Sequence, residues 1–255
     1  MEDITDIQNI LQFYISAGVD QTCGDDICLL KKDVQQPQTA PLLRPATTRL
    51  AQDMTASRQN ARELCTKAET LDELRQLVSS FDGCALKLTA KSTVFGDGNK
   101  NADVMIIGEA PGADEDRIGL PFVGRSGRLL EKMLSAIGLK REDVYITNVL
   151  PWRPPGNRTP TDAEIAVCLP FLKRQIELIN PKIILLLGGS AANAVLDNTD
   201  SISRLRGHFL DYTLSTKTVI PALASFHPAF LLRNSAQKAK AWTDFLRLFK
   251  KLKEN

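Results

Sequence analysis

The 255-residue sequence lacks an apolar run that approaches the roughly 20 residues of a membrane-spanning helix. It also lacks a basic start followed by an apolar signal core, because its first residues, MEDITDIQNI, are acidic and amphipathic. No strong charge excess is present either, since 32 Lys and Arg against 30 Asp and Glu give a net charge of +2. We therefore expect a cytoplasmic protein with no membrane partner, whose contacts with any nucleic acid are local.

Cysteine is scarce, and its number is odd. The five cysteines stand at positions 23, 28, 65, 84 and 168, and only the first two are close in sequence. An odd number of cysteines without an export signal argues against a disulfide framework. We expect reduced thiols, and the spacing alone is a weak signal for a metal site.

Three segments of the chain differ in composition. Residues 1–32 begin with apolar side chains at helical spacing, which predicts a short amphipathic helix over 4–17. Residues 33–60 are rich in Gln, Pro, Thr and Ala, which predicts a flexible linker. Residues 61–255 have the apolar content of a globular domain, and a further helix is predicted over 57–80.

Apolar runs and helical patterns alternate in the rest of the chain. The runs predict buried strands at 104–108, 144–149, 182–188 and 218–224, and the helical patterns lie at 126–138, 161–179 and 189–196. Strands that are apolar throughout and separated by helices are typical of a parallel sheet covered on both faces. The sequence therefore predicts an α/β fold, a three-layer α/β/α sandwich around a four-stranded parallel sheet.

The carboxyl ends of these predicted strands carry polar residues of several kinds. The first strand ends at Gly108 and Glu109, the second runs to Asn148, and the fourth leads to His227. Ligands of open parallel sheets bind beyond the carboxyl ends of the strands, so we expect a site there. The alternatives are that Asn148 caps a turn and that His227 is a structural histidine before a helix.

The turn after the first strand, GEAPGADED at 108–116, is acidic. It has neither the lysine of a P-loop nor a GxGxxG spacing, and its carboxylates would repel a pyrophosphate, which excludes nucleotide phosphate as the ligand. Carboxylates that face a ligand suit a site that orients water or stabilises an oxocarbenium-like sugar. The alternative is a solvated helix start whose acids interact with the helix dipole.

Four motifs carry a resemblance to a known family. GEAPGADED, LPFVGRSGRLL, YITNVLPWRPPGNRTP and HPAFLLR follow in this order within about residues 70–250. They resemble the uracil-DNA glycosylase superfamily, and the family 4 enzymes in particular. The resemblance implies that 61–255 is a catalytic domain that flips uracil out of DNA and hydrolyses its N-glycosidic bond, leaving an abasic site without cutting the strand. The alternatives are a different base preference, such as hypoxanthine or mispaired thymine, or a non-catalytic uracil-DNA-binding module.

The resemblance also implies roles for individual residues. Phe122 would stack on the base, unless it is ordinary core, and Asn148 would bind the pairing edge of uracil. His227 would donate a hydrogen bond to uracil O2. Glu109 or Glu115 would orient the water or stabilise the cationic sugar, and the sequence does not choose between them. Further substrate-binding candidates are Gly108, Gly112 and Asn157.

Two segments are candidates for contact with DNA, and we expect a monomer whose partner is uracil-containing DNA. SISRLRG contributes Arg204 and Arg206, and the end of HPAFLLR contributes Leu231, Leu232 and Arg233. An apolar wedge flanked by arginines can enter the vacated base stack while the phosphates are neutralised. The alternative is that the two leucines face the core.

The cysteines depart from the pattern that the resemblance implies. Family 4 enzymes are similar in holding a 4Fe-4S cluster with four cysteines, whereas Phe81 and Trp152 replace two of them here and only Cys84 and Cys168 remain. Two thiolates cannot supply the four usual ligands. We therefore expect no cofactor and no metal, with the two aromatic residues filling the volume as core; the alternative is that Cys23 and Cys28 act as substitute ligands.

Overall fold

The structure is a computed structural model that describes the backbone of residues 46–254 and the side chains from residue 55 onward. The helix predicted over 4–17 and the first part of the predicted linker lie outside these residues. Helix α2 (Ala46–Cys65) occupies the second part of the linker, so the prediction of a flexible linker over 46–60 is wrong. This stretch has no glycine or proline and contains many good helix formers, which explains the helix.

The single helix predicted over 57–80 is divided into two. Helix α3 (Leu71–Ser80) starts at a capping box in which Thr70 Oγ1 accepts from the Glu73 amide at 3.2 Å. The Glu73 carboxylate in turn accepts from the Thr70 amide at 3.3 Å. Because this box satisfies the free amides of a new helix start, it ends the α2 periodicity before residue 71.

A six-stranded sheet lies at the centre, in the order β1-β3-β2-β4-β6-β5. The four parallel strands are β2 (Val104–Gly108), β3 (Val144–Asn148), β4 (Ile183–Leu187) and β6 (Val219–Ser225). The antiparallel edge strands β1 (Asp97–Gly98) and β5 (Phe209–Thr213) bring the predicted four strands to six. The sequence missed them because β1 has only two residues and β5 is partly exposed.

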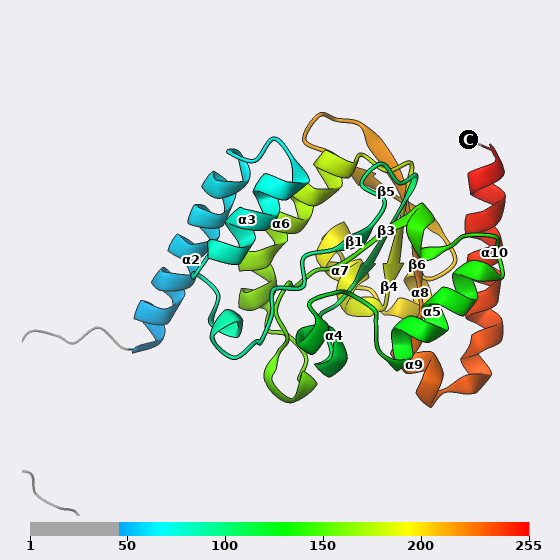
Figure 1. The fold of residues 1–255 in the computed structure, drawn as a ribbon, viewed down its shortest axis with the longest axis horizontal. Helices are drawn as coiled ribbons and strands as arrows, with labels where there is room; N and C mark the ends of the chain where they lie inside the picture. The colour runs from blue at the N-terminus through cyan, green and yellow to red at the C-terminus, as the bar shows by residue number, and fades with distance from the viewer. Residues whose placement is uncertain (1–45, 255) are drawn as a thin grey trace, which may run out of the picture. The chain divides into compact units, whose positions relative to one another are not determined.

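Helices cover both faces of the sheet, as Figure 1 shows. One layer holds α2, α3, α6 (Asp162–Ile179) and α7 (Gly189–Leu196), which pack with Met105 and Ile107 of β2. The other holds α5 (Arg125–Ser135) and α10 (Lys238–Glu254), which pack with Val104 and Ile106 of the same strand. The predicted α/β/α sandwich is confirmed.

Short helices complete the described part of the chain. They are η1 (Ala85–Leu88), α4 (Ala113–Ile118), η2 (Arg141–Asp143), η3 (Pro155–Asn157), α8 (Ile202–Leu205), α9 (Pro228–Arg233) and η4 (Ser235–Gln237). Within the range that the structure describes, no helix has the length and apolar character needed to cross a membrane. The sheet register places Gly108 beside Asn148, so the carboxyl ends of β2 and β3 lie side by side.

Candidate active site

Gly108, Asn148 and Phe122 meet at the carboxyl end of the sheet. A Cβ on Gly108 would collide with Asn148 Oδ1 and would lie 2.7 Å from two carbons of the Phe122 ring. Only a glycine at this position lets both side chains approach the strand end so closely. The amide and the aromatic ring predicted to bind a base are therefore brought together.

Asn148 has a buried carbonyl oxygen without a hydrogen-bond donor. Its side chain is 5% exposed, and Oδ1 has no partner among the residues with described side chains. Buried polar atoms are nearly always paired in proteins, and an unpaired one costs about 1–3 kcal/mol. An unpaired acceptor beside an aromatic ring at the strand ends indicates a position where a ligand supplies the donor.

Phe122 lies between the core and the site. It is buried against the α5 face of the sheet, and its ring centroid is 5.5 Å from that of His227, with the two planes at 32°. Its φ of 52° is in the left-handed region, which is unfavourable for a residue with a side chain. The backbone thus holds this ring against the edge of the sheet at some conformational cost.

His227 precedes α9, and its ring has a defined tautomer. Nδ1 accepts a hydrogen bond from the Ala229 amide at 3.1 Å, so the proton of the neutral imidazole is on Nε2. Burial, and to a smaller extent the positive charge of Arg233, lower the pKa of His227 to about 4. The residue is therefore a neutral hydrogen-bond donor at physiological pH.

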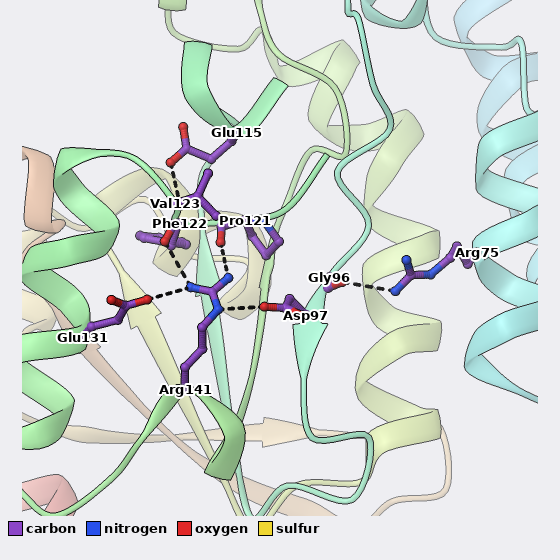
Figure 2. Close-up of polar contacts among 9 residues, drawn as sticks. All are labelled: Arg75, Gly96, Asp97, Glu115, Pro121, Phe122, Val123, Glu131 and Arg141. Atoms are coloured by element: carbon purple, nitrogen blue, oxygen red, sulfur yellow. Dashed lines mark hydrogen bonds and ion pairs between the residues drawn. The ribbon is translucent and has the colours of Figure 1, made fainter. Parts of the chain in front are cut away.

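The two candidate catalytic acids have different surroundings. Glu115 Oε1 accepts from the amides of Val123 at 3.0 Å and Gly124 at 2.9 Å, and Figure 2 draws the first of these bonds. Glu109 is half-buried, and burial raises its pKa, although a hydrogen bond from Ser190 opposes the rise. Glu115 is thus bound by two backbone amides, whereas Glu109 remains the candidate for the predicted catalytic acid.

The remaining residues of the acidic turn have structural contacts. A Cβ on Gly112 would lie 2.7 Å from Glu115 Oε2, so this glycine makes room for the carboxylate. Asp116 is buried, and its Oδ1 accepts from the amides of Lys91 at 2.8 Å and Ser92 at 3.2 Å. Of the four acids in the turn, Glu115 and Asp116 therefore hold neighbouring loops, and the exposed Asp114 forms a loose ion pair with Arg117 at 3.6 Å.

Ser190 lies at the carboxyl end of the sheet, whereas Asn157 lies in an exposed turn. Ser190 is at the start of α7, immediately beyond β4, and its contact with Glu109 links two neighbouring strand ends. Its place after the third predicted strand was the signal that could have identified it. Asn157 is exposed in η3 with a φ of 55°, and its Oδ1 accepts from Arg153 Nε at 2.8 Å.

The two leucines of HPAFLLR differ in exposure. Leu231 is fully buried in a cluster with Phe226 and Ala241, so it belongs to the core and cannot be a wedge. Leu232 is 40% exposed, and Arg233 beside it is exposed as well. The wedge predicted for both leucines is thus restricted to Leu232.

The two arginines of SISRLRG differ in the same way. Arg206 donates to the buried Asp244 carboxylate at 2.6 and 3.1 Å and to the Lys240 carbonyl, so it is not available to a phosphate. The prediction that Arg206 contacts DNA does not agree with these bonds. Arg204 has a side chain that is 81% exposed and a loose ion pair with Asp200 at 3.6 Å, which leaves it accessible.

The residues at the expected cluster position do not fit four-thiolate ligation. Cys84 and Cys168 have their Sγ atoms 3.9 Å apart, and Phe81 stacks on Trp152 with ring centroids 6.4 Å apart. The indole nitrogen of Trp152 donates to Thr93 Oγ1 at 3.1 Å, which satisfies its one polar atom. Among the residues that the structure describes, no group of three or more His, Cys, Asp or Glu residues is arranged to hold a metal. Cys23 and Cys28 lie outside the described residues, so their predicted alternative role as ligands stays untested.

Comparisons with known proteins show the family of the chain. Residues 95–250, more than half of the chain, match the model of the uracil DNA glycosylase superfamily. A type-4 uracil-DNA glycosylase of Thermotoga maritima is 43% identical over 176 residues, which are 69% of this chain and 90% of the relative.

Two further relatives extend the comparison. A type-4 uracil-DNA glycosylase of Archaeoglobus fulgidus is 42% identical over 71% of this chain and 92% of its own length. A type-5 uracil-DNA glycosylase of Pyrobaculum aerophilum is 32% identical over 55% of this chain and 67% of its own length. The chain therefore belongs to the uracil DNA glycosylase superfamily and is a hydrolase of the DNA glycosylase class.

Proposed function

We propose that this enzyme removes uracil from DNA by hydrolysing the N-glycosidic bond, and that it leaves an abasic site without cutting the strand. The observation that carries the proposal is the convergence of Phe122, His227 and the unpartnered Asn148 Oδ1 at one edge of the sheet. An enzyme that acts on a flipped base needs an aromatic surface for stacking and polar groups for the pairing edge. These three side chains supply both.

Asn148 provides the base specificity in this proposal. Its side chain amide offers an acceptor and a donor side by side, which match N3–H and O4 of uracil. Cytosine presents the opposite arrangement at these positions, so it would leave both polar groups of the protein unpaired. The buried Oδ1 gains its missing donor only when the correct base enters.

His227 and Glu109 act on the bond that breaks. As the C1′–N1 bond lengthens, its electron pair moves onto the base, and the Nε2–H of neutral His227 stabilises the charge that gathers on O2. Water attacks C1′ and loses a proton to Glu109, whose raised pKa makes it a better base. Glu115 is left out of the chemistry because two backbone amides already hold it.

DNA contacts follow from the exposed residues near α9. Leu232 would enter the space vacated by the base, while Arg233 and Arg204 neutralise nearby phosphates. Arg206 and Leu231 do not contact DNA in this proposal, because Arg206 is paired with Asp244 and Leu231 is buried in the core.

The test is a labelled oligonucleotide with one uracil, assayed for abasic product before and after alkaline cleavage. We expect product that appears only after alkali, and a loss of at least about 100-fold in kcat for Glu109→Gln, as for removal of a general base. Glu115→Gln is the matched control, which should lower the melting temperature more and the rate less. Parallel substrates with hypoxanthine or a mispaired thymine test the base range. An absence of product at enzyme excess would reject the proposal.

We further propose that the enzyme works as a monomer without an iron–sulfur cluster. Phe81 and Trp152 are buried in aromatic contacts at two of the four ligand positions, which supports this assignment. Iron analysis and visible absorption of the purified full chain test it, and stoichiometric iron with a charge-transfer band would contradict it. Sedimentation velocity with and without DNA measures the oligomeric state.

A further inference from the structure

Arg141 joins the loop that carries Phe122 to the edge of the sheet, as Figure 2 shows. Its guanidinium donates to the carbonyl of Pro121 at 2.6 Å and to that of Phe122 at 3.1 Å. Nε donates to Asp97 at 2.7 Å, and Nη1 also reaches Glu131 at 3.3 Å. One side chain thus engages two consecutive carbonyls and two carboxylates.

The loop held in this way, residues 121–124, is clamped from two sides. Arg141 binds the carbonyls of its first two residues, and Glu115 accepts from the amides of its last two. A cation on the carbonyls and an anion on the amides are the charge-assisted forms of these bonds, which are stronger than neutral ones. Together they fix the backbone on both sides of the Phe122 ring.

This backbone needs support because it is unfavourable by itself. Phe122 has a φ of 52°, and such conformations persist only where the surroundings over-determine them. Gly127 allows the bend, since a Cβ there would collide with the Phe122 carbonyl. That carbonyl is one of the two bound by Arg141, so the arginine acts at the strained residue itself.

The edge strand β1 orients the arginine. Asp97 is in β1, which pairs with β3, and its carboxylate binds Nε of Arg141. The side chains of Arg141 and Asp97 are 23% and 32% exposed, and a partly exposed ion pair of this kind adds little to stability. Its geometry nevertheless determines where the two Nη groups point, and therefore where the loop sits.

We propose that Arg141 is a positioning residue for uracil recognition, which acts through Phe122 by holding its carbonyl so that the ring is preorganised to stack on the base. The inference rests on the proposed function for its kinetic consequence, whereas the clamp itself concerns the backbone of residues 121–124. A lysine would not replace the arginine, because one ammonium cannot reproduce the fork that binds two carbonyls and a carboxylate.

The kinetic test is a double-mutant cycle on the full chain. We expect Arg141→Gln to lower kcat/KM for a uracil oligonucleotide about tenfold, as for the loss of one charge-assisted hydrogen bond. Arg141→Lys should not restore it. In a Phe122→Ala background the further loss from Arg141→Gln should disappear, because the residue that it positions is gone. Equal losses in both backgrounds would overturn the proposal.

Arg174→Gln is the matched control variant. Arg174 likewise donates to a backbone carbonyl, that of Ala68 at 2.7 and 3.0 Å, and pairs with Glu177 at 2.9 Å. Its side chain is 27% exposed, close to the 23% of Arg141, but it contacts the turn between α2 and α3 rather than residues 121–124. Both variants should lower the melting temperature similarly, and only Arg141→Gln should slow excision.

Hydrogen exchange tests the clamp independently of catalysis. Arg141→Gln should speed exchange of the Val123 and Gly124 amides by about tenfold, without changing that of β2 and β3. If the wild-type chain proves inactive, the proposed function fails while this measurement still decides the clamp. If Arg141→Gln does not fold, Asp97→Asn is measured in its place, because it weakens only the contact that orients Nε of Arg141. Unchanged exchange at both amides would overturn the inference.

Discussion

Asn148→Leu is expected to raise the stability of the enzyme and to lower its activity strongly. The side chain of Asn148 is buried, and its Oδ1 has no donor among the residues whose side chains are described. Leucine has a similar shape and removes the unpaired acceptor, which costs about 1–3 kcal/mol in the unliganded enzyme. For a chain of this size each kcal/mol changes the melting temperature by about 2–4 °C, so the variant should melt several degrees higher.

The same substitution removes both hydrogen bonds to the pairing edge of the base. At about 1.4 kcal/mol for each bond, which is tenfold in rate, kcat/KM for a uracil oligonucleotide should fall at least about 100-fold. The measurements are a thermal melt and a single-turnover excision assay on the same preparation. A lower melting temperature together with retained excision would refute the assignment of Asn148 as the base-reading residue.

Thr147→Val is the matched control for that experiment, since it is the preceding residue of β3 and is also buried. Thr147 Oγ1 donates to the Phe95 carbonyl at 2.7 Å, so its polar atom is satisfied. Replacing it with an isosteric apolar group should cost about 0.5–1.5 kcal/mol and leave excision within about twofold. Asn148→Leu should therefore be more stable than the wild type and much less active, whereas Thr147→Val should be less stable and nearly as active.

Three further outcomes are expected. Burial lowers the pKa of His227 to about 4, so between about pH 6.5 and 4 the unfolded chain binds a proton at this residue that the folded chain does not. The free energy of unfolding should therefore fall as the pH drops through this range. Denaturant titrations at several pH values should show a smaller fall for His227→Gln. Gly108→Ala should cost about 1–3 kcal/mol through overpacking and stop excision, whereas Gly189→Ala, whose Cβ meets its nearest side chain at 3.6 Å, should melt and react normally. Leu231→Ala should lower stability by about 2–5 kcal/mol, and Leu232→Ala should keep the wild-type melt but slow excision from duplex DNA more than from single strands.

Much of the fold could be read from local patterns. The parallel strands are apolar throughout because both of their faces are covered, so their runs stand out in the sequence. The same property identified the strand ends, and with them Gly108, Asn148 and His227. The helix break at Thr70 was also encoded locally, in the TLDE capping box, but the continuing apolar periodicity concealed it. The edge strands had no such signal, since β1 is too short and β5 too exposed.

The sequence by itself determined the α/β class, the family and the edge of the sheet where the site lies, because these follow from short-range periodicity and from motifs within single segments. The choice between similar neighbours came from the tertiary structure alone. Glu115 could be distinguished from Glu109 because the fold brings the amides of residues 123 and 124 to the Glu115 carboxylate. Leu231 differs from Leu232 because it is packed in the core beneath α9. Arg206 differs from Arg204 because it forms an ion pair with Asp244 on α10. Such contacts depend on how separate helices and loops pack together, which no local pattern contains.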